Sequence, residues 1–156
     1  MGAGVIFSLL FIYCFALVAA KVDLTNFNKL SDRYYCSQST WQFHEALLEC
    51  KQAGMNLVSL ENEEKQFDLI KVLPNYIPTG GFWVGGARTD DRVWYWVGKN
   101  FTKVTFTNWG TGQPTNFVGD FFECMRLGNY NKYDEKYMWE NIDCFAFLFF
   151  ICEMDV

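Results

Sequence analysis

The pattern of apolar and polar positions predicts a first amphipathic helix within residues 39–54. Its apolar residues recur at intervals of three and four, as on one buried helix face: Phe43, Ala46, Leu47 and Cys50. Ser39 is followed three residues later by Gln42, which fits a capping box, so we expect the helix to begin at Ser39. Gly54 is expected to end it.

A second helix is predicted from Asn62 to just before Pro74. Glu63 and Glu64 would lie in its first turn, where the helix dipole favours acidic side chains. We expect its buried face to consist of Phe67, Ile70 and Leu73. A short strand over residues 57–60 separates the two helices.

After residue 80 the pattern changes to short strands rich in aromatic and β-branched residues. The predicted strands cover residues 82–86, 93–97, 122–127, 137–140 and 145–152. Residues 98–121 contain many Gly, Asn and Thr and form a loop region long enough to be a candidate binding surface. Two early helices and a late sheet predict an α+β domain.

The first 20 residues carry no charged side chain and end in the small residues Val18, Ala19 and Ala20. This predicts a cleaved secretory signal peptide, and therefore a secreted, extracellular protein. Residues 21–32 would form a short polar lead, and residues 33–156 one domain. No later apolar stretch approaches the ~20 residues of a membrane helix, so we expect no membrane span after cleavage. A retained anchor is the alternative.

Composition and charge narrow the function. The chain of 156 residues is 51% hydrophobic, which excludes disorder, and its net charge of −5 makes nucleic acid an unexpected partner. His44 is its only histidine, and neither a Gly-x-Ser-x-Gly elbow nor a His-Glu-x-x-His pair occurs. We therefore expect no enzyme, with a glycosidase-like carboxylate pair as the remaining enzymatic alternative.

The cysteines indicate disulfide bonds. Of six cysteines, Cys14 lies in the predicted signal peptide, which leaves five in the domain. A secreted chain meets an oxidising compartment, and an odd count leaves one thiol without an internal partner. Structural zinc is disfavoured because no Cys-x-x-Cys occurs. The triplet Asn100-Phe101-Thr102 predicts N-glycosylation of Asn100.

The ordered motifs of residues 33–154 resemble a C-type lectin domain, and in particular the short secreted single-domain lectins of arthropods. The motifs are Ser39-Thr40-Trp41, Phe82-Trp83-Val84-Gly85-Gly86, Trp94-Tyr95-Trp96, Asn108-Trp109, Gln113-Pro114-Thr115-Asn116, Glu123-Cys124, Trp139-Glu140-Asn141-Ile142-Asp143-Cys144 and Phe150-Ile151-Cys152-Glu153. The resemblance implies two helices packed on a small antiparallel, aromatic-rich sheet with a long loop region. It also implies the disulfides Cys50–Cys152 and Cys124–Cys144. Cys36 is left unpaired, either as the cross-link of a disulfide-linked dimer or as a half-buried thiol.

The resemblance further implies a calcium ion in the long loops that also binds two sugar hydroxyls. Calcium needs six to eight oxygen ligands. Its ligands at matching positions would be Gln113, Glu140 and Asn141, the last two in swapped order. The match is incomplete, because Thr115 stands where the family has Asp or Asn, and Phe122 where it has Glu. Asn116 could replace Thr115 if the loop is shifted, and Glu123 or Asp120 could supply the missing carboxylate as a fourth ligand. Pro114 occupies a position that is typically cis in the family.

Two functional interpretations remain open. The first is a secreted carbohydrate-binding protein that recognises glycans on microbes or host surfaces, with calcium as cofactor and a lean toward galactose implied by Gln113. The glycan would contact Gln113, Thr115, Asn116, Glu140, Asn141 and the loop residue Trp109. The alternative is a calcium-independent C-type-lectin-like protein that binds a protein partner. The four tryptophans at 83, 94, 96 and 139 are expected in the core.

Overall fold

The computed structural model describes residues 23–73, 78, 80–115, 123–130 and 135–155. Its helices are α1 (Phe43–Gln52) and α2 (Glu63–Val72). Its strands are β1 (Phe27–Lys29), β2 (Tyr34–Ser37), β3 (Asn56–Leu57), β4 (Phe82–Arg88), β5 (Trp94–Trp96), β6 (Thr102–Lys103), β7 (Glu123–Tyr130), β8 (Glu135–Asp143) and β9 (Phe149–Glu153). The predicted α+β class and its two helices are confirmed. In the described part of the chain, no helix is long and apolar enough to cross a membrane.

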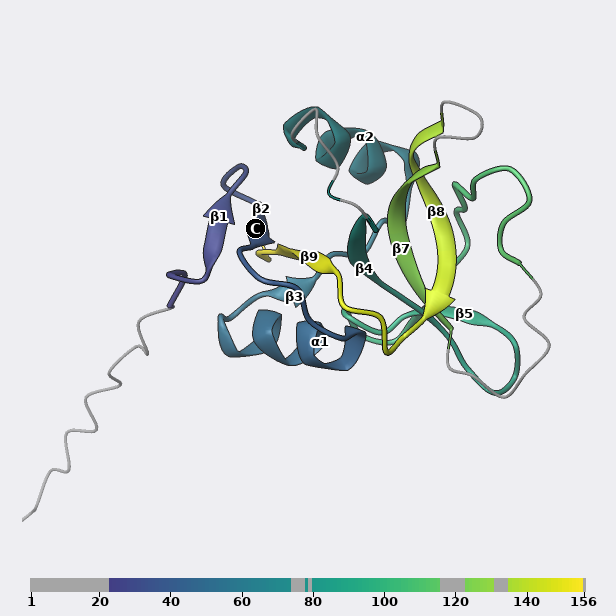
Figure 1. Cartoon of the computed structure of the whole chain (residues 1–156), viewed down its shortest axis with the longest axis horizontal. Helices are drawn as coiled ribbons and strands as arrows, with labels where there is room; N and C mark the ends of the chain where they lie inside the picture. Colours follow the sequence, from purple (N-terminus) through teal and green to yellow (C-terminus); the bar gives the residue numbers. More distant parts are fainter. Residues whose placement is uncertain (1–22, 74–77, 79, 116–122, 131–134, 156) are drawn as a thin grey trace, which may run out of the picture.

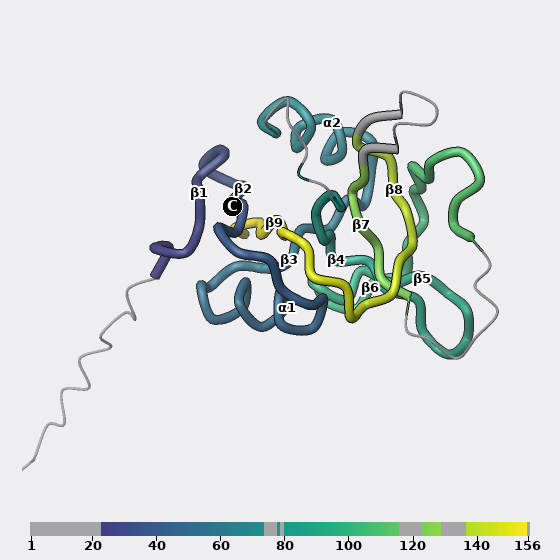
Figure 2. The backbone as a smooth tube through the Cα atoms, in the orientation of Figure 1, coloured from purple at the N-terminus to yellow at the C-terminus, as the bar shows by residue number. Residues whose placement is uncertain are grey.

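The strands form one sheet with the order β1-β2-β9-β4-β5-β6, in which β3 also pairs with β9 and β7 connects β4 to β8. Figure 1 shows β7 and β8 as a long twisted hairpin on one side of the domain, and β1, β2 and the end of β9 on the other. The sheet is mixed rather than purely antiparallel, because β4 and β9 run parallel. Figure 2 traces how β5 and β6 extend the sheet beyond β4.

Helix α1 begins later than its sequence predicts. Its N-cap is Gln42 rather than Ser39, and the Gln42 amide donates to the Glu45 carboxylate at 3.1 Å. The preceding residues are held in extended form because Trp41 exchanges two backbone hydrogen bonds with Leu148. The helix ends as predicted, since Gly54 follows Ala53 with a φ of 68°.

Helix α2 begins after Asn62 as predicted, but its buried face differs. Asn62 accepts a hydrogen bond from the Lys65 amide, whereas Phe67 is 58% exposed. Leu73 is buried as predicted and Ile70 is half-buried, but Gln66 and Leu69 take the place of Phe67 on the buried face. The Gln66 side chain accepts from the indole of Trp139 at 2.8 Å and donates to a backbone carbonyl of β8 at 2.9 Å. A polar side chain therefore faces inward because a buried indole N–H needs a partner.

Buried aromatic rings fill the centre of the domain. Trp83, Trp96 and Trp139 are fully buried, as expected, and Trp94 is half-buried. The Trp83 indole donates to the Trp41 carbonyl at 2.9 Å, which ties the core to the segment before α1. The segment predicted as a polar lead contributes β1, which pairs with β2 and adds its Phe27 ring to this core.

Both implied disulfides are present: Cys50–Cys152 joins α1 to β9, and Cys124–Cys144 joins β7 to the end of β8. The first closes a sequence separation of 102 residues. By chain-entropy arithmetic such a loop contributes about 4–5 kcal/mol to stability. Cys36 is unpaired and half-buried, and burial raises the pKa of its thiol to about 11.

Candidate functional site

The candidate site lies where the loop of residues 110–115 meets the start of β7 and the end of β8. Asn141 is its centre. Its side-chain amide donates to the Thr115 carbonyl at 2.9 Å and to the Glu123 carboxylate at 3.0 Å. Its side-chain oxygen accepts from the Thr115 amide at 2.6 Å and from the Thr115 hydroxyl at 3.1 Å. Asn141 therefore fastens the loop to the sheet through three hydrogen bonds to Thr115, and a fourth joins it to Glu123 of β7.

Gln113 completes this cluster from the loop side. Its side-chain oxygen accepts from the backbone amides of Thr115 and Asn141, each at 3.3 Å. The peptide bond between Gln113 and Pro114 is cis, as the sequence resemblance implied. Gln113 is half-buried and Thr115 is exposed, whereas Asn141 and Glu123 are buried behind them. The surface of the cluster is thus formed by one amide and one hydroxyl side chain.

An arginine that sequence analysis overlooked completes the site. Arg88, at the end of β4, places a guanidinium nitrogen 2.6 Å from the Glu123 carboxylate. The register of the sheet brings them together, since Arg88 lies directly opposite Glu123 in the antiparallel pair of β4 and β7. The Glu123 carboxylate therefore has a cationic partner on one oxygen and the Asn141 amide on the other.

Glu140 does not join this cluster. Successive side chains of a strand point to opposite faces of the sheet, so Glu140 faces away from its neighbour Asn141. It pairs instead with Arg126, whose guanidinium lies 2.5 Å from the carboxylate and also donates to the Gly80 carbonyl. A Cβ at Gly128 would lie 2.3 Å from the Glu140 carboxylate, so the glycine leaves the room that this side chain needs beside β7. The alternation of side chains along a strand could have shown from the sequence that Glu140 and Asn141 belong to different faces of the sheet.

Trp109 packs inward beside the site. Its ring centre lies 4.9 Å from that of Trp94 and 5.7 Å from that of Trp139, and the ring is half-buried. Backbone hydrogen bonds join the segment to β8, because the Trp139 amide donates to the Asn108 carbonyl and the Trp139 carbonyl accepts from the Gly110 amide. The main contacts of Trp109 thus hold the loop against the sheet.

Several predicted residues lie outside the described part of the chain. They are Asn116, Asp120 and Phe122 of the loop region and the predicted signal peptide of residues 1–20. Asn100 is exposed at the β5–β6 turn with a φ of 54°, and its glycosylation stays a prediction.

The residues that the structure describes at this site do not fit a calcium ion. Calcium requires six to eight oxygens, several of them carboxylates. Within residues 110–115, 123–130 and 135–143, the cluster has one carboxylate, Glu123, and Arg88 neutralises it. The Asn141 side-chain oxygen already accepts from the Thr115 amide and hydroxyl, and its side-chain nitrogen donates to the Thr115 carbonyl. These oxygens are therefore engaged in hydrogen bonds rather than directed at a cation. Among the described residues, no group of three or more His, Cys, Asp or Glu side chains could hold a metal.

Comparisons with known proteins agree on one family. The family model described as the lectin C-type domain matches residues 38–154. The chain is 29% identical over 133 residues to the CD209 antigen-like protein D of Mus musculus, covering 84% of this chain and 50% of that protein. It is 23% identical over 142 residues to the C-type lectin mosGCTL-7 of Aedes aegypti, covering 88% of this chain and 93% of that protein. The chain thus spans about half of the mouse protein and most of the mosquito protein.

Solved structures share the fold. The carbohydrate-recognition domain of the human scavenger receptor C-type lectin superposes with a TM-score of 0.67 at 24% identity, covering 85% of this chain and 98% of that domain. Human lithostathine superposes with a TM-score of 0.64 at 19% identity, covering 85% of this chain and 90% of that one.

Proposed function

Because the chain belongs to the C-type lectin domain family, whose members are non-enzymatic carbohydrate-binding proteins, we propose that it is a secreted glycan-binding protein that works without calcium. Its ligand would be a neutral saccharide on a microbial or host surface. The saccharide would contact the loop surface formed by Gln113 and Thr115. Secretion rests on the apolar residues 1–20 and on two disulfides, which persist in oxidising compartments.

The ion pair between Arg88 and Glu123 is the observation that carries the proposal. A carboxylate that serves a metal must direct its oxygens at the ion, and this one already directs an oxygen at a guanidinium. A divalent ion on the same carboxylate would lie about 5 Å from the guanidinium and be repelled by several kcal/mol at an effective dielectric constant of 20. Arg88 thus supplies the positive charge that a cation would otherwise supply.

The remaining groups suit direct hydrogen bonding to a sugar. The Gln113 oxygen accepts two backbone hydrogen bonds and leaves the side-chain NH₂ as a donor, whereas the Thr115 hydroxyl donates to Asn141 and leaves its lone pairs as acceptors. Gln113 and Thr115 present these groups at the surface, while Asn141 holds them in place from behind. Adjacent sugar hydroxyls both donate and accept hydrogen bonds, so they need donors and acceptors side by side on the protein. The lean toward galactose, which came from Gln113 by resemblance, stays part of the proposal.

Retention on immobilised galactose and mannose tests the proposal directly. We expect retention that is the same in calcium and in EDTA, and that falls in the variant Gln113→Ala. Gln38→Ala is the matched control, because Gln38 is an exposed glutamine that follows β2, which two other strands separate from β7 in the sheet. Release by EDTA would overturn the calcium-independent part. Absence of any saccharide retention would overturn the function.

A protein partner is the second candidate function, and it is favoured as well by the lack of a fitting metal site in the part of the chain that the structure describes. A disulfide-linked dimer through Cys36 belongs to this candidate. Electrophoresis of the secreted protein without reducing agent distinguishes a disulfide-linked dimer from a monomer. A band at twice the monomer mass that disappears in Cys36→Ser would support the dimer, and a monomer band alone would exclude it.

A further inference from the structure

An apolar cavity opens between the first turn of α1, the end of β4 and the disulfide at the start of β7. Its volume is about 240 Å³. The apolar part of its lining consists of Phe43, Ala87, Cys124, Cys144 and Phe145. We propose that this cavity is a docking site for a basic peptide segment of a protein partner. The segment inserts one large apolar side chain into the cavity and places Lys or Arg side chains on the rim.

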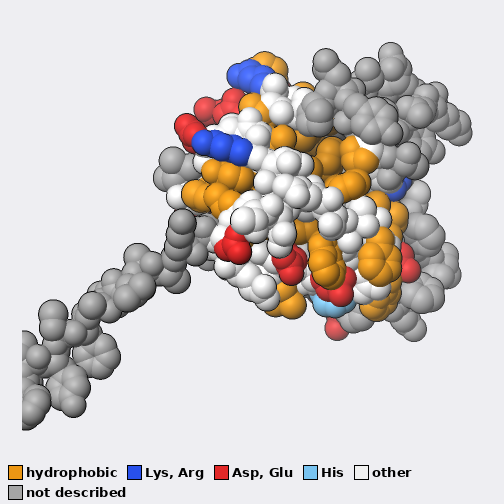
Figure 3. All heavy atoms as spheres, turned by 60° about the vertical axis from the view of Figure 1, so that its left-hand side comes forward, with side chains coloured by type: hydrophobic (Ala, Val, Ile, Leu, Met, Phe, Trp, Pro, Cys, Tyr) orange, Lys and Arg blue, Asp and Glu red, His pale blue; other side chains and the backbone are white. Residues whose placement is uncertain are grey.

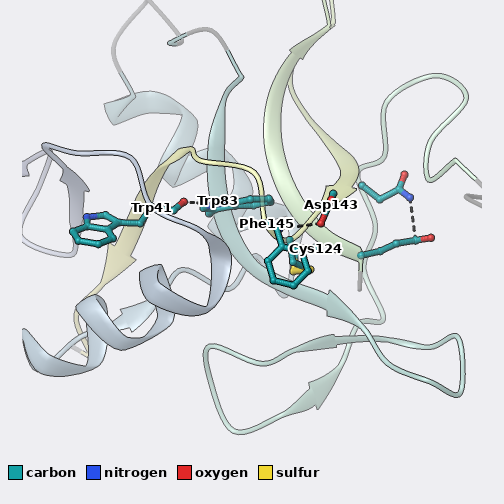
Figure 4. Close-up of a disulfide and its surroundings, with 8 residues drawn as sticks. Trp41, Trp83, Cys124, Asp143 and Phe145 are labelled. Atoms are coloured by element: carbon teal, nitrogen blue, oxygen red, sulfur yellow. Dashed lines mark hydrogen bonds between the residues drawn. A yellow bond between two sulfur atoms is a disulfide. The ribbon is translucent and has the colours of Figure 1, made fainter. Parts of the chain in front are cut away.

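The cavity has the size and the lining that one aromatic side chain needs. An apolar protein cavity of about 150 Å³ holds a benzene molecule, so a volume of about 240 Å³ accommodates a phenyl or indole ring. Phe145 lines the cavity although 55% of its surface is exposed, and Figure 4 shows its ring beside the disulfide of Cys124. An inserted ring would contact both the Phe145 ring and the sulfur atoms, which are favourable neighbours for an aromatic group.

The turn that presents the Phe145 ring is held in place. The Phe145 amide donates to the Asp143 carboxylate at 3.0 Å, and the Cys144 carbonyl accepts from the Phe43 amide at 3.0 Å. The disulfide between Cys124 and Cys144 joins the same turn to β7. The binding surface is therefore already formed before a partner arrives, which reduces the entropy that is lost on binding.

The charges around the cavity select the occupant. Within the lining, Arg88 and Glu123 pair at 2.6 Å and neutralise each other. Two acidic residues adjoin the lining: Glu45 lies in the first turn of α1, and Asp143 directly precedes the disulfide turn. Figure 3 shows acidic and hydrophobic side chains together around the single histidine, His44, whereas the Lys and Arg side chains of that view lie farther away. The rim of the cavity is therefore negative.

A negative rim around an apolar cavity favours a basic segment over the other occupants of such a surface. A second copy of the chain would bring the same acids face to face, and an anionic membrane would be repelled by them. Lys or Arg beside the inserted side chain instead meets complementary charge. Glu45 and Asp143 each already accept one backbone amide, but a carboxylate has lone pairs for further donors.

This inference goes beyond the proposed glycan binding and does not depend on it. The proposed saccharide surface consists of Gln113 and Thr115, whereas neither of these residues lines the cavity. The cavity gives the second candidate function, a protein partner, a defined place on the molecule.

Peptide titrations of the secreted protein test the docking site. The probes are Lys-Lys-Trp-Lys-Lys, its acidic counterpart Glu-Glu-Trp-Glu-Glu, and Lys-Lys-Ala-Lys-Lys. The readout is the NMR signal of the imidazole of His44, which lines the cavity and is the only histidine of the chain. We expect the first peptide to shift this signal in a saturable way and the other two to bind at least about tenfold more weakly. Equal binding of either counterpart, or no shift at millimolar concentrations of the first, would overturn the proposal.

Matched variants separate the apolar contribution from the electrostatic one. Glu45→Gln together with Asp143→Asn removes both charges but keeps the acceptors, and should weaken binding of the basic peptide about two- to tenfold. Asp68→Asn is the control, because Asp68 is a partly exposed acid on α2. Phe145→Ala should also weaken binding about two- to tenfold. Its control is Phe67→Ala, because Phe67 is 58% exposed on α2, which Figure 1 shows on the opposite side of the domain from α1.

The remaining outcomes decide between this site and its alternatives. Unchanged melting temperatures would show that the variants are folded, and an unchanged peptide affinity in either test variant would then overturn the proposal. Dimerisation that is lost in Phe145→Ala would assign the cavity to a second copy. A larger His44 shift with phosphatidylserine vesicles than with the basic peptide would assign it to a membrane, and either result would overturn the basic segment. Saccharide retention should be unchanged in Phe145→Ala, and peptide affinity should be unchanged in Gln113→Ala, so the two sites fail independently.

Discussion

Removal of the Arg88 guanidinium is the sharpest test of the electrostatic argument. The Glu123 side chain is 2% exposed and its partner is 21% exposed, so Arg88→Ala leaves a nearly buried carboxylate without its counter-charge. Breaking such a pair from one side costs about 3–5 kcal/mol. The partial exposure of Arg88 places the expected loss at about 3 kcal/mol. For a domain of this size, that corresponds to roughly 10 °C in the melting temperature.

A double-mutant cycle apportions this loss. Glu123→Gln removes the charge but keeps a hydrogen-bonding side chain beside Asn141, so its expected cost is about 1 kcal/mol. The double variant Arg88→Ala/Glu123→Gln should cost less than Arg88→Ala alone, because no buried charge remains. The coupling energy between the two sites should be about 2 kcal/mol.

Urea unfolding of the disulfide-intact domain at pH 7 provides the free energies. Lys71→Ala serves as the control, since Lys71 and Asp68 form an ion pair whose side chains are 54% and 47% exposed. That exposed pair should contribute less than about 1 kcal/mol. Strict additivity in the Arg88–Glu123 cycle, or a loss below about 1 kcal/mol for Arg88→Ala, would refute the view that the guanidinium takes the place of a metal.

Three further predictions concern other parts of the chain. Leu69→Ala should lower the free energy of unfolding in urea by about 2–5 kcal/mol, whereas Phe67→Ala should change it by less than about 0.5 kcal/mol, because only Leu69 is buried. Since burial raises the pKa of the Cys36 thiol to about 11, less thiolate forms at pH 8, and iodoacetamide should modify the native protein about 100-fold more slowly than the urea-unfolded protein; equal rates would contradict this. The variant Arg88→Ala/Asn141→Asp places two carboxylates together, so 10 mM CaCl₂ should raise its melting temperature by roughly 4 °C and leave that of the wild type unchanged.

Local signals in the sequence predicted the elements, and non-local contacts decided where some of them begin. The start of α2 at Asn62 was predictable because a cap involves only a few neighbouring residues. The start of α1 was not, because Trp41 pairs with Leu148, far away in the sequence. Likewise, periodicity alone placed Phe67 in the core, since it could not show that a buried Trp139 indole needs Gln66.

The candidate site was only partly predictable for a similar reason. The family motifs identified Gln113, Thr115 and Asn141, which the structure brings together. They could not show that Arg88, 35 residues before Glu123, neutralises its carboxylate. Only the pairing register of β4 and β7 reveals that contact.

The pairing of β2 with β9 has a practical consequence for how the domain can be mounted. Tyr34 lies opposite Glu153, so the first and last described segments leave the domain side by side, on the side away from the β7–β8 hairpin (Figure 1). A tether or fusion partner joined at either terminus would therefore leave the loop of residues 110–115, the proposed saccharide site, pointing outward. Copies mounted on one support could engage a dense glycan coat together, which multiplies the avidity of individually weak contacts.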